Sequence, residues 1–180
     1  ALFSIWNRNF LDSQSHALLV YNDKLKSLVD YIQQLEMESN GKSHSNENET
    51  LNYSTSPIIW GGVGTNGQHS YHQLLHQGTN TFSAAFYLVA DQGEELLEHQ
   101  EWLIANALAQ AKVLKQGNKV KDQNLNYKSL VGNHPSSTIL LNKITPEIIG
   151  ALLAVHEHKV FCEGALWHIN SFDQWGVEHG

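Results

Sequence analysis

The run TFSAAFYLVA at residues 81–90 decides the fold class of this chain of 180 residues. It is almost entirely apolar, has the length of a strand and is followed by Asp91. A hydrophobic run that does not alternate with polar residues is typical of a strand that helices cover on both faces of a sheet. Residues 81–90 are therefore predicted to be a buried strand.

The segments on both sides of this run alternate between strand and helix signals. Short apolar strands are predicted at 57–60 and 138–141, the second of them buried. Long helices are predicted at 94–116 and from 145–147 onward, where a capping Thr, a Pro and an acid follow one another. Alternating strands and helices indicate an α/β fold with a mainly parallel sheet. With no internal repeat or linker, residues 1–180 are predicted to be a single α/β domain.

Two helices have residues whose spacing predicts a core-facing side. Asn22 is expected to cap the first, and its apolar residues are Leu25, Leu28, Val29 and Ile32. The residues of 94–116 that are expected to face the core are Leu97, Ile104, Leu108 and Ala111. The polar stretch 43–56 between the first helix and the next strand is expected to be a loop.

Composition and charge exclude several classes of protein. The formal net charge is −7 and the lysines form no cluster, which argues against a nucleic-acid binder. The sequence contains no run of about 18 apolar residues, so no membrane-spanning helix is predicted. The single cysteine, Cys162, cannot form an internal disulfide, which favours a reducing compartment. It follows Val160 and Phe161, so a buried structural thiol is expected. The first residues read as the middle of a helix without a signal peptide, so a longer parent chain is expected.

A glycine-rich turn is predicted at 61–67, after the strand at 57–60. Within it, GVGTNG at 62–67 matches the G-x-G-x-x-G pattern, and Asp91 ends the next predicted strand. This pattern permits two interpretations: a dinucleotide site with its phosphates at a helix start, or glycines that only make a tight turn. The helix expected at 69–76 is short and rich in histidine, which argues against the nucleotide.

Three histidines on that helix raise the question of a metal. His69, His72 and His76 are spaced i, i+3 and i+7, so they are expected on one helix face and could bind zinc. No carboxylate or cysteine in the segment completes such a site, and a polar, hydrogen-bonding face is the simpler interpretation. His156 and His158 are interpreted as charge partners at a helix end.

Two glutamates stand near the end of the first helix, in the stretch QQLEMESNGK at 33–42. Glu36 and Glu38 are two residues apart and cannot face the same way on a helix. The simplest interpretation makes both of them surface charges.

Five motifs together resemble the glucose-6-phosphate isomerase (phosphoglucose isomerase) family. They are MESNGK at 37–42, WGGVGTNGQH at 60–69, HQGT at 76–79, EHKVF at 157–161 and NSFDQWGVE at 170–178. They occur in the order of the family and span nearly the whole chain. The chain thus resembles the C-terminal portion of such an enzyme.

The resemblance implies a three-layer α/β/α sandwich of the sugar isomerase type. It implies reversible isomerisation of glucose 6-phosphate and fructose 6-phosphate through a cis-enediol, with no metal or nucleotide cofactor. It further implies a cytoplasmic homodimer that acts in glycolysis and gluconeogenesis. Expected partners therefore include the sugar phosphate and a second subunit, but neither nucleic acid nor membrane.

The same resemblance assigns four site residues. Glu38 matches the base that moves the proton between C1 and C2. His69 matches the histidine that assists ring opening and is lent to the neighbouring subunit's site. Gln34 and Gln174 match substrate-contacting glutamines, the second near the phosphate.

Two parts of the family pattern are not found in these residues. The signature continues past Gly180 to a lysine, and the phosphate-gripping arginine and Ser/Thr loop belong to an earlier domain. The 180 residues alone are therefore expected to be inactive. Two alternatives stay open at this point: an NAD-dependent oxidoreductase that uses the turn at 62–67, and a non-catalytic sugar-phosphate-binding module.

Overall fold

A parallel four-stranded sheet forms the centre of the structure, a computed structural model that describes residues 1–91 and 97–180. The strands are β1 (Ser15–Val20), β2 (Ile58–Val63), β3 (Phe82–Asp91) and β4 (Ser136–Lys143). Their order in the sheet is β2-β1-β3-β4, and every neighbouring pair is parallel. The prediction of an α/β fold with a mainly parallel sheet is confirmed.

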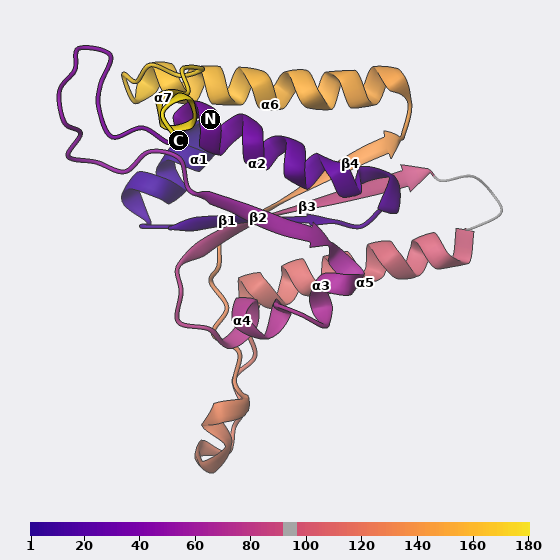
Figure 1. Cartoon of the computed structure of the whole chain (residues 1–180). Coiled ribbons are helices and arrows are strands. Elements are labelled where there is room, and N and C mark those ends of the chain that lie inside the picture. Colours follow the sequence, from indigo (N-terminus) through magenta and orange to yellow (C-terminus); the bar gives the residue numbers. More distant parts are fainter. Residues whose placement is uncertain (92–96) are drawn as a thin grey trace.

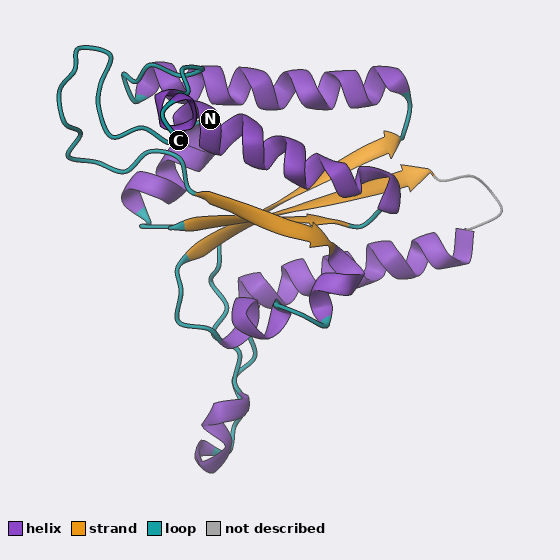
Figure 2. Cartoon of the chain, in the orientation of Figure 1, coloured by secondary structure: helices purple, strands orange, loops and turns teal. Residues whose placement is uncertain are grey.

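Helices cover both faces of this sheet (Figure 1). On one face, α2 (Lys26–Asn40) and α6 (Pro146–Leu166) pack with a core that includes Leu28, Ile32 and Leu152. On the other, α4 (His72–Gln77) and α5 (Leu97–Gln116) pack with a core that includes Leu75 and Leu114. Figure 2 shows the resulting helix–sheet–helix layers, which confirm the expected three-layer sandwich.

The described residues also form shorter helical segments. They are α1 (Leu2–Ile5), η1 (Trp6–Phe10), η2 (Asp23–Leu25), α3 (Gly64–Gln68), η4 (Gln123–Lys128) and α7 (Trp175–Glu178). The segment that carries η4 projects from the body of the molecule (Figure 1). No helix in the described residues is both long enough and apolar enough to cross a membrane.

The strand that decides the fold class lies where its composition indicates. Residues 82–89 of β3 are all buried, and β3 pairs with β1 on one side and β4 on the other. Because helices cover both faces, neither set of alternating side chains meets water, and all of these residues except Ser83 are apolar. The prediction for 81–90 is confirmed.

The strand β1 was not predicted, although it lies inside the sheet between β2 and β3. Its residues, SHALLV, start with two polar side chains and contain strong helix formers, so the local signal for a strand is weak. Pairing determines their state instead: Ala17 lies opposite Trp60 of β2 and Ala84 of β3. Tertiary context overrides local preference here.

Two predictions of burial were partly wrong. β4 is an edge strand whose burial alternates, so Leu140 is 61% exposed while Ile139 and Leu141 pack against the core. On α5, Ile104 and Ala111 pack against the core as predicted, but Leu97 and Leu108 are exposed. The predicted start of this helix at 94–96 lies outside the described residues.

The glycine-rich segment at 61–67 is not only the turn that was predicted. β2 continues through Val63, and α3 begins at Gly64. Gly61 has a φ of 142°, and a Cβ atom there would lie 2.0 Å from the Leu18 carbonyl oxygen of β1. A glycine is therefore required at 61 for β2 to approach β1.

Cys162 is exposed, so the expectation of a buried thiol was wrong. The apolar run that contains it lies on α6, where side chains at consecutive positions point about 100° apart. Val160 is buried, whereas Phe161 and Cys162 are exposed.

The predicted helix starts are confirmed by their caps. The Asn22 side chain accepts a hydrogen bond from the Lys24 N–H (2.9 Å) at the start of η2, which leads directly into α2. Thr145 Oγ1 accepts one from the Ile148 N–H (3.3 Å) at the start of α6. Such caps satisfy backbone N–H groups that have no partner within the helix.

Candidate active site

A cleft of about 290 Å³ brings together three of the four predicted site residues. Gln34 and Glu38 line it from successive turns of α2, because residues four apart lie on one helix face. Gln174, at the start of α7, lines the cleft from the C-terminal segment. Residues 140 positions apart in the sequence thus meet at one site.

Three further residues line the same cleft and were not predicted. Tyr31, Leu35 and Ser39 lie on the same part of α2 as Gln34 and Glu38. The Tyr31 hydroxyl donates a hydrogen bond to Glu157 Oε1 of α6 (2.8 Å) and so connects the two helices beside the cleft. The spacing of Tyr31 and Glu38, seven residues or two helical turns, was a signal that could have identified the tyrosine.

Glu38 is partly buried, and its carboxylate accepts no hydrogen bond from the residues that the structure describes. Lys42 lies one turn further and donates to the backbone carbonyls of Glu38 (2.8 Å) and Ser39 (2.7 Å). These bonds satisfy carbonyls at the end of α2, where a positive charge is favourable. Burial lowers the pKa of Lys42, while the charges of Asp173 and Glu38 act in the opposite direction. The Glu38 carboxylate is left available to a ligand in the cleft.

Glu36, by contrast, is buried, so its interpretation as a surface charge was wrong. Its Oε2 lies 2.6 Å from Lys159 Nζ of α6, and Lys159 also lies 3.0 Å from Glu163 Oε1. Burial alone lowers the pKa of Lys159, but the two carboxylates offset this and raise it above its ordinary value. Burial raises the pKa of Glu163, although Lys159 opposes the change.

Two histidines extend this buried cluster toward the sheet. The Tyr87 hydroxyl lies 3.1 Å from His156 Nε2, and His16 Nδ1 lies 2.7 Å from Ser83 Oγ. Burial and the positive charge of Lys159 lower the pKa of His16 to about 3 and that of His156 to about 4. His156 is thus a neutral side chain in the middle of α6, and its interpretation as a charge partner at a helix end was wrong.

His69 does not join the cleft in this chain. It is exposed and lies directly after α3, beyond the carboxyl end of β2. Glu38 lies beside the start of β2, where the Ile59 N–H donates to the sulfur of the neighbouring Met37 (3.3 Å). The length of β2, about 16 Å for its six residues, separates the two ends. One chain therefore cannot place both residues on one small sugar.

The other histidines do not form the face that was considered for zinc. His69 precedes α4, so it does not share a helix with His72 and His76. Those two bind one acceptor on α5, Gln110 Oε1, from His72 Nδ1 (3.2 Å) and His76 Nε2 (2.6 Å). Their interpretation as hydrogen-bonding residues is confirmed. The described residues contain no group of three or more metal-ligating side chains.

The glycines at 62–67 accommodate aromatic rings. A Cβ atom at Gly64 would lie 2.2 Å from a ring carbon of Tyr21, and one at Gly67 would lie 2.4 Å from the Tyr71 hydroxyl. The helix they open, α3, has only five residues. Asp91 ends β3, which β1 separates from β2. These features support the tight-packing interpretation and leave the nucleotide interpretation without support.

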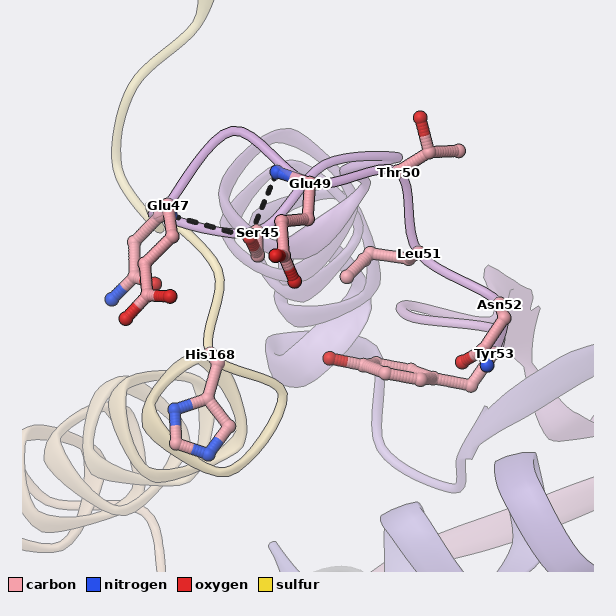
Figure 3. Close-up of a pocket in the computed structure, with 9 residues that line it drawn as sticks. Ser45, Glu47, Glu49, Thr50, Leu51, Asn52, Tyr53 and His168 are labelled. Carbon is pink, nitrogen blue, oxygen red and sulfur yellow. Dashed lines mark hydrogen bonds between the residues drawn. The ribbon is translucent and has the colours of Figure 1, made fainter.

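A second, larger pocket of about 430 Å³ lies between the loop at 43–56 and the end of α6 (Figure 3). Glu47, Glu49 and His168 line it, and Ser45 Oγ accepts hydrogen bonds from the backbone N–H groups of both glutamates. Two carboxylates without a lysine or arginine repel a phosphate. This pocket contains none of the four predicted site residues, whereas the cleft at Glu38 contains three of them.

Comparison with known proteins identifies the family of this chain. The sequence model of the family described as "Phosphoglucose isomerase" matches residues 1–180. Glucose-6-phosphate isomerases of Shewanella sp. (strain ANA-3) and Shewanella halifaxensis are each 47% identical to this chain over 195 aligned residues, with 99% of the chain covered.

Solved structures give the same result for the fold. A glucose-6-phosphate isomerase from Chlamydia trachomatis superposes with a TM-score of 0.92 and 41% identity, over 99% of this chain and 36% of that one. A hypothetical protein from Thermus thermophilus has a TM-score of 0.73 at 22% identity, over 99% of this chain and 41% of its own, and shows the fold alone.

The chain spans 36% of the length of the Shewanella relatives. The family match nevertheless extends over every residue of the chain. The chain therefore belongs to the phosphoglucose isomerase family.

Proposed function

We propose that this chain is the C-terminal portion, within the sugar isomerase domain, of an enzyme that interconverts glucose 6-phosphate and fructose 6-phosphate. The observation that carries the proposal is the cleft in which Gln34, Glu38 and Gln174 meet. Membership of the family and the names of the relatives support it. The proposed setting is the cytoplasm, in glycolysis and gluconeogenesis.

Glu38 acts as the base in this proposal. It removes the proton from C2 of open-chain glucose 6-phosphate, and the C–H electron pair forms the C1–C2 double bond of the enediol as the C1 oxygen gains a proton. Glu38 then gives its proton to C1, and loss of the O2 proton completes the ketone. One carboxylate that reaches both carbons serves both steps. The Glu38 carboxylate accepts no hydrogen bond from the described residues, which suits this role.

The two glutamines hold the substrate against Glu38. Gln34 stands one turn before Glu38 on α2, and Gln174 faces both from the C-terminal segment. Amide groups both donate and accept hydrogen bonds, which suits sugar hydroxyls and phosphate oxygens. Their role is to orient the sugar so that C1 and C2 both lie within reach of the base.

The enzyme is proposed to be a homodimer in which His69 assists ring opening at the neighbouring subunit's site. The position of His69, beyond the opposite end of β2 from Glu38, supports this arrangement. Histidine suits the task because it exchanges protons near neutral pH. The 180 residues alone are expected to show no turnover, because the proposed phosphate grip lies in another part of the enzyme.

The complete enzyme with Glu38→Gln tests the proposal. Conversion of fructose 6-phosphate is followed through coupling to glucose-6-phosphate dehydrogenase. We expect kcat to fall by about 10²- to 10⁴-fold, with KM changed only a few-fold, because glutamine keeps the shape but cannot take the proton. The control is Glu49→Gln in the pocket of Figure 3, for which unchanged activity is expected. Full turnover by the Glu38 variant would refute the role of Glu38 as the base.

A further inference from the structure

We infer that Asn40 and Ser171 form a latch that positions Gln174 opposite Glu38. The inference rests on the proposed function, since it assigns both residues a role in orienting the substrate. Asn40 is the last residue of α2 and is completely buried. It lies two residues after Glu38, and Ser171 lies three residues before Gln174.

Both polar atoms of the Asn40 side chain are hydrogen-bonded. Its Nδ2 donates to the Val160 carbonyl of α6 (3.0 Å), and its Oδ1 accepts from Ser171 Oγ (2.5 Å). One side chain thus fixes the end of α2 to α6 and to the C-terminal segment. A buried amide with both of its atoms satisfied specifies one arrangement of the elements it joins.

Gly164 of α6 makes room for this contact. A Cβ atom at this position would lie 1.9 Å from Ser171 Oγ and 3.3 Å from Asn40 Oδ1. The absence of a side chain therefore lets the C-terminal segment lie directly against α6. Gly150 of the same helix has no neighbouring atom within 4 Å of such a Cβ. The two glycines thus provide a matched pair for an experiment.

The segment that carries Gln174 depends on such a latch for its conformation. His168 and Phe172 have φ values of 51° and 69°, which non-glycine residues rarely adopt. Backbone in this region persists only where surrounding contacts hold it. The Gln174 side chain in turn donates to the Phe172 carbonyl (2.8 Å), so its orientation follows that of the strained residue. Asn40 and Ser171 are therefore positioning residues that act through Gln174.

A double-mutant cycle in the complete enzyme tests the latch. Ser171→Ala is expected to lower kcat/KM for fructose 6-phosphate about tenfold, mainly through KM, because the base is intact while Gln174 is displaced. In the Gln174→Ala background, the same substitution is expected to add less than a twofold loss. In the Gln34→Ala background, the tenfold loss is expected in full.

Substitution of Gly164 or Gly150 gives a second test of the latch that keeps the Ser171 hydroxyl in place. Gly164→Ala is expected to reproduce the rise in KM, and Gly150→Ala is expected to leave both constants unchanged. Suppose that Gln174→Ala impairs the enzyme. The latch is then refuted if Ser171→Ala leaves KM unchanged, or if its loss adds in full to that of Gln174→Ala, and in both cases the proposed function stands. If Gln174→Ala itself has no effect, the assignment of Gln174 to the site is refuted, and the latch with it.

Discussion

Glu36 and Glu38 are two residues apart on α2 but occupy opposite environments. Glu36 is buried beside Lys159, whereas Glu38 lines an open cleft and accepts no hydrogen bond from the described residues. The difference follows from the helix, since two residues correspond to a rotation of about 200°. One face of α2 therefore holds the helix against α6, and the other presents the proposed base. A carboxylate with strong partners is poorly suited to exchange a proton with a substrate, so the two tasks need two residues.

Lys159→Met is expected to have the largest effect on the buried side of α2. It removes the cation between Glu36 and Glu163 and leaves two buried carboxylates without a counter-charge. Loss of one partner from a buried ion pair destabilises proteins by about 3–5 kcal/mol. Urea unfolding followed by circular dichroism measures the change.

The control for Lys159 is Lys42, the cation on the open side. Lys42→Met removes hydrogen bonds to two carbonyls at the end of α2, and a loss of about 1 kcal/mol or less is expected. Equal losses for the two variants would contradict the distinction between the two faces.

Glu36→Gln is expected to have an intermediate effect on stability, and it makes a direct comparison with Glu38→Gln. Glutamine keeps the size of the side chain but loses the charge that faces Lys159, while Glu163 continues to compensate that lysine. We expect a loss of about 1–3 kcal/mol. Glu38→Gln removes no hydrogen bond from the described residues, so a change within about 0.5 kcal/mol is expected.

The effects of the two glutamate substitutions on activity are expected to have the opposite order to their effects on stability. The Glu38 variant should lose kcat while the Glu36 variant, assayed below its unfolding temperature, should keep it within a few-fold. A Glu36 variant that unfolds normally but has lost turnover would show that the buried cluster takes part in catalysis.

The sequence predicted the layers of the fold better than the two environments on α2. β3 could be predicted because its buried residues are adjacent in the sequence and, apart from Ser83, apolar. The burial of Glu36 depends on Lys159 and Glu163, which lie more than 120 positions away, and no local pattern connects them. β1 was not predicted for the same reason: its helix-forming residues become a strand only through pairing with β2 and β3, which are distant in the sequence.

The candidate site was predicted through motifs, and its geometry was not. Gln34 and Glu38 share a helix face, which spacing alone supports, but their approach to Gln174 depends on how the C-terminal segment folds back. His69 looked like part of one helix with His72 and His76. The chain turns between α3 and α4, so His69 lies at the opposite end of the sheet from Glu38.

Acid is expected to weaken the buried side of α2 gradually, by less than the substitution Lys159→Met. Burial and Lys159 hold the pKa of His156 at about 4 and that of His16 at about 3, below the unfolded value of about 6.5. Their contribution to stability is therefore complete above pH 6.5 and is lost as the pH falls toward these values, because only the unfolded chain binds the protons.

Between pH 6.5 and 5.5 we expect the free energy of unfolding to fall by about 1 kcal/mol, since each histidine contributes up to about that amount and both keep some contact with water. Urea unfolding at the two pH values measures the slope. His156→Gln, which leaves a polar group beside Tyr87 but cannot titrate, is expected to lower the slope by about half. An unchanged slope in this variant would mean that the pH dependence arises elsewhere, for example at the exposed histidines. Protonation of His156 would then not account for the loss of stability in acid.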